Sequence, residues 1–261
     1  MRALLLAALG LICSGALAQA PDFSQPGLAV ALNKAGRQRM LSQRIVLSYA
    51  QAAKGVAQTL ARENLRDAIR RFDEQLAELK AYSTNSEILQ AILEIERQWM
   101  PVRTLAQRPA TPQAASDLNA AGEQLLRAAE RGVAVLERHA RTPSGRILSL
   151  AGRQRMLSQR IAKNYLLLSW VPGQDEIRHE LGVAVEDFQA SLAQLHAGSA
   201  GNETLQKELA VADAQWGVLR AVVGGDPRTP TDSLAVVEAS DALLHRMERI
   251  ALIYQRLAAT R

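Results

Sequence analysis

The chain of 261 residues has little of several residue types that mark particular classes of protein. Its only cysteine is Cys13, so a disulfide framework and a cysteine-based metal site are excluded. Phe, Trp and Tyr together make up 4% of the residues, and the nine prolines leave long stretches without a helix breaker. Strong helix formers such as Ala, Leu, Gln, Arg and Glu dominate instead. The composition therefore predicts an all-α protein.

The chain also lacks the short motifs of common enzymes and cofactor proteins. It has no Gly-rich phosphate loop, no nucleophile elbow, no zinc-binding His-Glu-x-x-His and no haem-attachment motif. Glu176 and His179 have the Glu-x-x-His spacing of iron sites in helical bundles, but such sites use two of these motifs and the chain has no second one. We therefore expect no catalytic residues, no metal and no cofactor.

The N-terminus is typical of a secretory signal peptide, residues 1–20. Arg2 precedes an apolar run, and small residues that suit cleavage after Ala18 or Ala20 follow it. An alternative is acylation at Cys13, which the bulky Ile12 before it disfavours. We expect cleavage and a periplasmic location, with no later segment apolar enough to cross a membrane. The net charge of +5 then does not indicate nucleic-acid binding, because no basic run has interleaved aromatic residues.

Eleven consecutive residues occur twice without a change. Residues 35–45 and 151–161 both have the sequence Ala-Gly-Arg-Gln-Arg-Met-Leu-Ser-Gln-Arg-Ile, 116 residues apart. Weaker matches continue along both halves at nearly the same spacing, including Phe72 with Phe188 and Trp99 with Trp216. Two tandem copies of one module are predicted.

Turn signals in one copy help to locate those in the other. Pro172-Gly173 interrupts the second copy after its first helix, so the equivalent break in the first copy is expected near Gly55. Each copy then has three turns between four helices, with heptad-like apolar spacing. We predict two tandem up-and-down four-helix bundles, residues 27–141 and 146–259. Trp99 and Trp216 are expected to be core residues.

A helical wheel separates the three arginines of the repeated segment. Arg39 and Gln43 lie in a sector of small and apolar residues, so we expect this sector to face another helix. Arg37 and Arg44 lie on nearly the opposite side and are expected to face solvent. The second copy repeats the pattern with Arg155 and Gln159 on one side and Arg153 and Arg160 on the other.

An arginine at a helix interface requires an anionic partner or water, because it keeps its proton. One alternative is a carboxylate of another helix, and the other is a bound anion. Gly36 and Gly152 each cost about 1 kcal/mol of helix propensity. A close helix contact, or space for a ligand, would justify that cost.

The repeated Gly-x-x-Arg-Met-x-Ser-x-Arg arrangement resembles the periplasmic sensor domains of the nitrate/nitrite sensor kinases NarX and NarQ and of the type IV pilus chemotaxis transducer PilJ. In that family this segment is the P-box, which begins the first helix of a four-helix bundle. The arginine three residues after the glycine contacts the anion in nitrate-sensing members. The resemblance therefore implies that Arg39 and Arg155 contact a ligand, with secondary contributions from Gly36, Gly152, Ser42, Gln43, Ser158 and Gln159.

Two functions follow from this resemblance. The first is a periplasmic sensor or binding protein for a small oxyanion, nitrate or nitrite, and the second is a ligand-free adaptor for an envelope or type IV pilus-associated complex. Family members carry transmembrane helices and a signalling domain, whereas this chain ends at Arg261. We therefore expect a sensor to need a membrane-bound or pilus-associated partner. A carboxylate paired to each P-box arginine would favour the adaptor, and a carboxylate-free pocket would favour the sensor.

The resemblance leaves two arrangements of the site open. In the nitrate-sensing relatives two subunits each supply one P-box arginine. A single chain with two copies can place Arg39 and Arg155 around one anion as a covalent pseudo-dimer. Alternatively, each copy pairs with its equivalent in a second chain, which gives a homodimer with two sites.

Overall fold

The computed structural model describes residues 26–259 apart from 84 and 141–142. The predicted signal peptide lies outside the described residues. Within them the regular structure is all α-helix, with turns between the helices and no strand, which confirms the expected fold class. The helices are α1 (Pro26–Ala53), α2 (Gln58–Tyr82), α3 (Ser86–Leu105), α4 (Pro112–Ala140), α5 (Pro143–Leu167), α6 (Gln174–Gly198), α7 (Glu203–Val222) and α8 (Pro230–Ala259).

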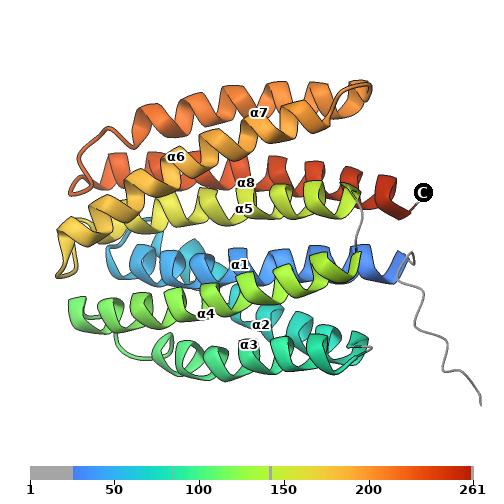
Figure 1. Ribbon diagram of the computed structural model, residues 1–261. Coiled ribbons are helices and arrows are strands. Elements are labelled where there is room, and N and C mark those ends of the chain that lie inside the picture. The colour runs from blue at the N-terminus through green and yellow to red at the C-terminus, as the bar shows by residue number, and fades with distance from the viewer. Residues whose placement is uncertain (1–25, 84, 141–142, 260–261) are drawn as a thin grey trace, which may run out of the picture.

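The helices form two four-helix bundles in tandem (Figure 1). In the first bundle, α1 packs on α2 and α4, and α3 packs on α4. In the second, α5 packs on α6 and α8, and α7 packs on α8. Among the described residues, no helix combines the length and apolar character that crossing a lipid bilayer requires.

Glycine and asparagine set the helix boundaries. Gly55 and Gly173 have φ angles of 74° and 81° in the turns after α1 and α5. Glycine tolerates this left-handed conformation, whereas most other residues are strained there. Asn85 and Asn202 cap α3 and α7, accepting hydrogen bonds of 2.9 Å and 3.0 Å from backbone N–H groups three residues further on. The break expected near Gly55 is thereby confirmed.

An aromatic stack lies in the core of each bundle. Trp99 lies 4.1 Å from Phe72 between ring centroids, and Trp216 lies 4.3 Å from Phe188. The two indole N–H groups donate hydrogen bonds to side chains of α2 and α6, which satisfies their polar atoms. Both tryptophans are buried, so their expected place in the core is confirmed.

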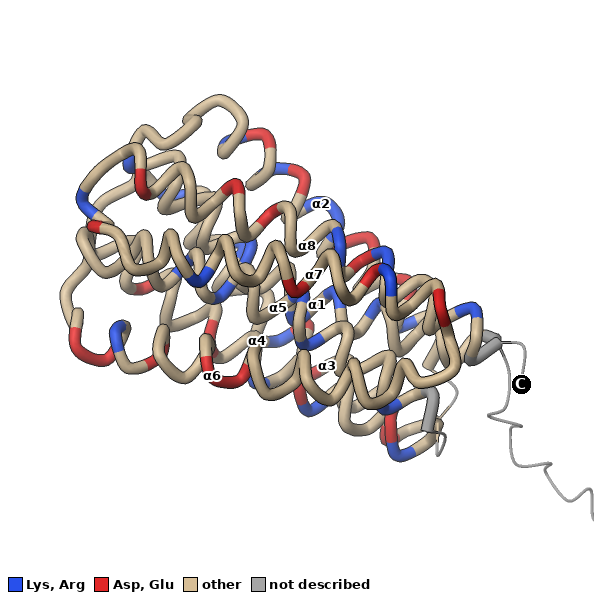
Figure 2. Tube along the Cα trace, turned by 90° about the horizontal axis from the view of Figure 1, so that it is seen from above, with Lys and Arg blue, Asp and Glu red and all other residues tan. Residues whose placement is uncertain are grey.

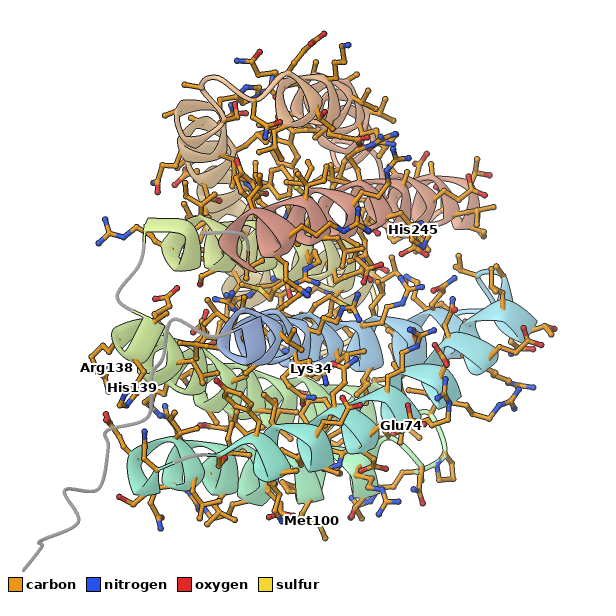
Figure 3. The ribbon with its side chains drawn as sticks, turned by 90° about the vertical axis from the view of Figure 1, so that its right-hand side faces the viewer. Lys34, Glu74, Met100, Arg138, His139 and His245 are labelled. Carbon is orange, nitrogen blue, oxygen red and sulfur yellow. The ribbon has the colours of Figure 1, made fainter. Side chains whose placement is uncertain are left out.

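The bundles are joined through their first and last helices. Helices α1 and α5 run side by side in the same direction (Figure 1), and α8 also contacts α1 while α4 contacts α5. The outer helix α3 therefore lies on the far side of its own bundle, as Met100 on its exposed face shows in Figure 3. Arg138 and His139, also labelled there, both contact Glu87 and connect the end of α4 to the start of α3.

Charges of both signs are interspersed over the outer helices (Figure 2). On α2, for example, Arg70 lies between Asp67 and Glu74 and pairs with both. Exposed pairs of this kind contribute little stability. The net charge of +5 is therefore spread over a mixed surface.

Two ion pairs cross between the bundles in equivalent places. Arg44 of α1 pairs with Asp241 of α8, and Arg160 of α5 pairs with Glu123 of α4 at 2.9 Å. The arginine side chains are only 15% and 20% exposed. The expectation that Arg44 and Arg160 face solvent was wrong, because the second bundle covers the side of α1 that a single bundle would leave exposed.

The Arg160–Glu123 pair has a second cation, Lys163, which the Arg44–Asp241 pair lacks. Lys163 is fully buried and donates a 2.6 Å hydrogen bond to Glu123, whereas its counterpart in the first copy is Leu47. Burial opposes ionisation of Glu123, but the adjacent Lys163 and Arg160 outweigh it and lower the pKa of this carboxyl group. Glu123 is therefore the shared counter-ion of two cations at the bundle interface.

We predict that Glu123→Gln lowers the free energy of unfolding by about 3 kcal/mol, because Lys163 is left buried without its counter-ion. The pKa of Glu123 is lowered in the folded state, so its contribution is present above the unfolded-state pKa and is lost as the pH falls through the folded-state pKa. Urea denaturation from pH 7 down to pH 3 should show a smaller acid-side loss for the variant than for the wild type. The matched control is Glu203→Gln, which removes an exposed pair and should change stability little. Equal effects of the two substitutions would contradict the prediction.

Candidate functional site

The equivalent arginines of the two repeated segments, Arg39 and Arg155, meet at the contact between α1 and α5. Arg39 and Arg155 are 5% and 0% exposed, so both guanidinium groups are inside the protein. A Cβ atom placed on Gly36 would lie 3.1 Å from Nη2 of Arg155 and 3.8 Å from Nη2 of Arg39. The same position is 3.6 Å from the Cα atom of Gly152. The glycines therefore let the helix backbones touch, and both guanidinium groups lie beside that contact.

Each arginine reaches across to the other helix. Nη2 of Arg39 donates a 3.0 Å hydrogen bond to the carbonyl oxygen of Ser149. Nη2 of Arg155 donates to Asn33, at 2.8 Å to the side-chain oxygen and 3.4 Å to the carbonyl oxygen. Asn33 and Ser149 occupy equivalent positions in the two copies, 116 residues apart. The contacts are thus reciprocal, as in a two-fold dimer.

No carboxylate in the described part of the chain forms an ion pair with either arginine. Burial lowers the pKa of Arg39 to about 10, although Glu130 and Glu137 oppose this shift from a greater distance. Burial, with a contribution from nearby Arg37, lowers the pKa of Arg155 to about 9. The Nε atoms of both arginines and Nη1 of Arg155 have no hydrogen-bond partner among the described residues. These buried donors are suited to a negatively charged ligand.

One member of the arginine pair, Arg39, lines an open groove of about 480 Å³ between α4 and α5. Arg146 and Arg153 of α5 line it as well, opposite Glu130 and Glu137 of α4. The groove therefore carries charges of both signs at its opening.

The equivalent side next to Arg155 has additional contacts. Asn33 donates a hydrogen bond to Gln255, and Arg37 lies 3.8 Å from Glu248. These four residues correspond to Ser149, Glu137, Arg153 and Glu130 on the side of the groove. An asparagine and a glutamine in place of a serine and a glutamate therefore connect α1 to α8 on one side of a nearly symmetric site.

The comparison with protein families agrees with the internal repeat. The family model PilJ, described as the N-terminal region of type IV pili methyl-accepting chemotaxis transducers, matches residues 23–125 and again residues 139–250. The chain belongs to the PilJ family. No curated protein and no solved structure matches it. The PilJ family is a sensory and signalling family rather than an enzyme family, and this chain carries two copies of its domain.

The serine and glutamine residues of the repeated segments have different partners in this PilJ protein. The hydroxyl groups of Ser42 and Ser158 donate to the carbonyl oxygens of Arg39 and Arg155 within their own helices. Gln43 donates to Ser42, at 3.3 Å. Gln159 accepts from Arg44 at 2.8 Å and donates to Asp241, so it belongs to the ion pair between the bundles. The structure thus brings together Gly36, Arg39, Gly152 and Arg155, and places the four serine and glutamine side chains in neighbouring contacts.

Asn33 and Ser149, which hold the arginines in place, were not predicted from the sequence. Neither lies in the repeated segment, and they differ from each other, so the duplication gives no signal for them.

Glu123 and Asp241 were not predicted as site residues either. They are both acidic and occupy equivalent positions 118 residues apart, so an alignment of the two copies could have identified them.

We predict that Gly36→Ala and Gly152→Ala fail to gain the stability that alanine normally adds to a helix. Each new Cβ atom would lie 3.0–3.1 Å from a buried guanidinium nitrogen of the opposite copy, which would have to move. The matched control is Gly217→Ala in α7, where no atom lies within 4 Å and a gain of up to about 1 kcal/mol is expected. Urea denaturation compares the three variants. Equal gains in all three would show that α1 and α5 are not in close contact.

Proposed function

We propose that this protein is a periplasmic receptor for a small oxyanion, nitrate or nitrite by its resemblance to the sensor family. The observation that supports the proposal is the convergence of two buried guanidinium groups without a carboxylate partner among the described residues. Membership of a sensory family agrees with a receptor role.

Electrostatics favours an anion at this position. Two buried cations close to one another repel, and their removal from water costs several kcal/mol per ion unless a counter-ion is present. An anion between them would reduce both effects and raise the lowered pKa values of Arg39 and Arg155. A guanidinium group presents paired N–H donors in a plane, which matches the oxygen atoms of a planar oxyanion better than an ammonium group does.

The parallel packing of α1 on α5 supports one site per chain. Each bundle supplies one arginine, and the contacts of Arg39 and Arg155 are made within the same chain. The faces that would join two subunits of a homodimer are thus already in contact with each other. The protein would then act as a covalent pseudo-dimer that needs no second copy to complete the site.

The anion would reach the pair through the groove between α4 and α5. Arg146 and Arg153 at this groove attract anions, while Glu130 and Glu137 partly offset that attraction. In this proposal, a membrane-bound or pilus-associated partner receives the binding event. A change in the packing of α1 on α5 is the structural change that such a partner would detect.

Calorimetric titration with nitrate and with nitrite tests the receptor function. We expect about one anion per chain, and loss of binding in both Arg39→Ala and Arg155→Ala, because each removes half of one site. Arg39→Lys should weaken binding about tenfold, since a charged hydrogen bond contributes about 1.5–3 kcal/mol. The matched control is Arg66→Lys on the exposed surface of α2, which should leave affinity unchanged.

Unchanged affinity in the double alanine variant, or no binding to the wild type at millimolar concentrations, would reject the receptor. The ligand-free adaptor for an envelope or pilus-associated complex would then replace it. A different result would be two anions per pair of chains, with binding at one site retained when the arginine of the other site is removed. That result would instead indicate a homodimer with independent sites.

The route by which the anion enters is tested by introducing the residues found next to Arg155 at the equivalent positions next to Arg39. Ser149→Asn together with Glu137→Gln reproduces the Asn33–Gln255 contact next to Arg39. We expect slower association and dissociation of the anion in stopped-flow measurements, with a smaller change in equilibrium affinity. The reverse control, Asn33→Ser with Gln255→Glu, should remove the contact next to Arg155 and leave association no slower. Unchanged rates in the variant with Ser149→Asn and Glu137→Gln would show that the groove is not the route.

A further inference from the structure

The second bundle contains a pocket of about 560 Å³ that is separate from the arginine pair. It lies between the end of α5, the start of α6 and the connection between α7 and α8, about 20 Å along α5 from Arg155. This volume is within the range of small-molecule sites, about 300–1,000 Å³. Tyr165, Gln174 and Arg178 are among its polar lining residues, and Leu168 and Leu181 are among its apolar ones.

The first bundle provides an internal comparison, because it has the same three polar side chains. Tyr49, Gln58 and Arg62 are the counterparts of Tyr165, Gln174 and Arg178. The hydroxyl group of Tyr49 donates one hydrogen bond that is shared between the carbonyl oxygens of Arg108 and Pro109, at 3.3 Å and 3.1 Å. The α3–α4 connection therefore closes over Tyr49.

Tyr165 lacks these contacts. The residue is 1% exposed, yet its hydroxyl group has no hydrogen-bond partner among the described residues. A buried hydroxyl without a partner costs about 1–3 kcal/mol. Burial, together with Asp232 and Asp226, raises the pKa of Tyr165 to about 12, so the hydroxyl group keeps its proton and can donate a hydrogen bond to a ligand.

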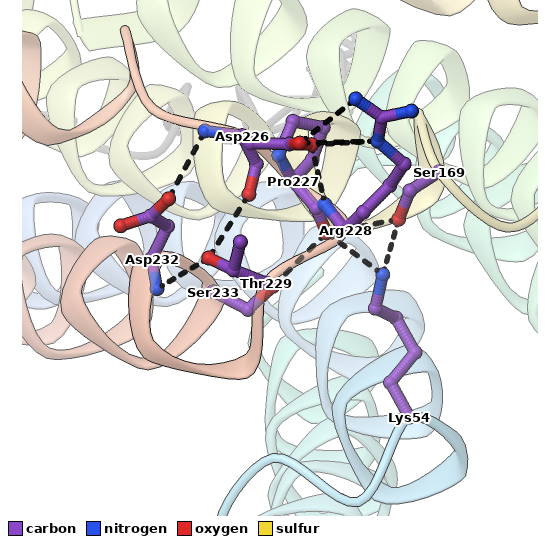
Figure 4. Close-up of polar contacts among 8 residues, drawn as sticks. All are labelled: Lys54, Ser169, Asp226, Pro227, Arg228, Thr229, Asp232 and Ser233. Atoms are coloured by element: carbon purple, nitrogen blue, oxygen red, sulfur yellow. Dashed lines mark hydrogen bonds and ion pairs between the residues drawn. The ribbon is translucent and has the colours of Figure 1, made fainter.

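The difference arises at one carbonyl group. Pro227 is the counterpart of Pro109, but its carbonyl oxygen accepts hydrogen bonds from Lys54 at 3.0 Å, Ser169 at 2.9 Å and Ser233 at 3.2 Å (Figure 4). The counterparts of these three residues are Trp170, Ala53 and Ala115, none of which has an amine or a hydroxyl group. The connection between α7 and α8 is therefore held toward the end of α1, where its proline carbonyl does not meet Tyr165.

The charges around the pocket favour an anionic group. Arg228 pairs with Asp226 at 2.8 Å, so these two charges largely cancel. Arg178 forms no ion pair with any carboxylate in the described residues, and it remains as the unpaired cation of the lining. A hydrogen-bond donor at the buried end and a cation at the exposed end suit a small molecule with two polar groups.

We propose that this pocket binds a small organic acid. The carboxylate pairs with Arg178, a second oxygen accepts the hydrogen bond of Tyr165, and the carbon chain contacts Leu168 and Leu181. Lys54 is a positioning residue, because it holds the α7–α8 connection away from Tyr165 without lining the pocket. The site is independent of the anion site proposed at Arg39 and Arg155.

Calorimetric titration with lactate, succinate and citrate tests the proposal on the whole chain. We expect at least one of these acids to bind at millimolar concentrations or below, and succinamide, which has no charge, to bind more weakly than succinate. Arg178→Gln should weaken binding about tenfold and Tyr165→Phe about fivefold, as expected for loss of a charged and of a neutral hydrogen bond. Arg62→Gln and Tyr49→Phe, the same substitutions in the first bundle, should leave affinity unchanged.

Thermal unfolding separates a loss of the fold from a loss of the site. Tyr49→Phe should lower Tm because it removes the hydrogen bond that the hydroxyl group shares between two carbonyl oxygens, whereas Tyr165→Phe removes none and should not. The double variant of Arg39→Ala and Arg155→Ala should still bind the organic acid, which distinguishes this pocket from the anion site. Absence of binding for all three acids at 10 millimolar, about the weakest affinity of a useful small-ligand site, would overturn the proposal. Equal effects of the substitutions in the two bundles would overturn it as well.

Discussion

Close contact between α1 and α5 is the constraint on which the rest of this structure depends. Gly36 and Gly152 remove the side chains that would separate the two helices, and their backbones touch. Because the helices run in the same direction, equivalent residues of the two copies lie on either side of one contact. Two arginines are thereby buried next to each other, an arrangement that a single bundle cannot produce.

At this interface the cations that surround the Arg39–Arg155 pair have carboxylate partners, whereas the two arginines of the pair do not. Arg44 pairs with Asp241, and Arg160 and Lys163 share Glu123. These contacts cross between the bundles and fix their relative position, since removal of a partner would leave a buried charge. Arg39 and Arg155 lack such partners among the described residues, so a mobile anion would complete the pattern.

Divergence of the two copies has made a symmetric framework structurally asymmetric. Arg39 lines an open groove, while a hydrogen bond between Asn33 and Gln255 spans the side next to Arg155. At the far end of α5, Pro227 accepts three hydrogen bonds and Tyr165 lines a pocket, whereas Tyr49 is covered. In both places, a few side-chain differences between the copies change the local contacts.

The sequence by itself determined the helical class, the duplication, the helix breaks and the inward side of Arg39. These features depend on the spacing of apolar residues, on the repeated segment and on turn residues, all of which are local in the sequence. The sequence misplaced Arg44 and Arg160, since a helical wheel cannot show that a second bundle covers the outer side. It gave no indication of Asn33 or Pro227 as contact residues. Their roles depend on which backbone carbonyl groups and side chains meet across the bundle interface, and those distances are decided only when both bundles pack together.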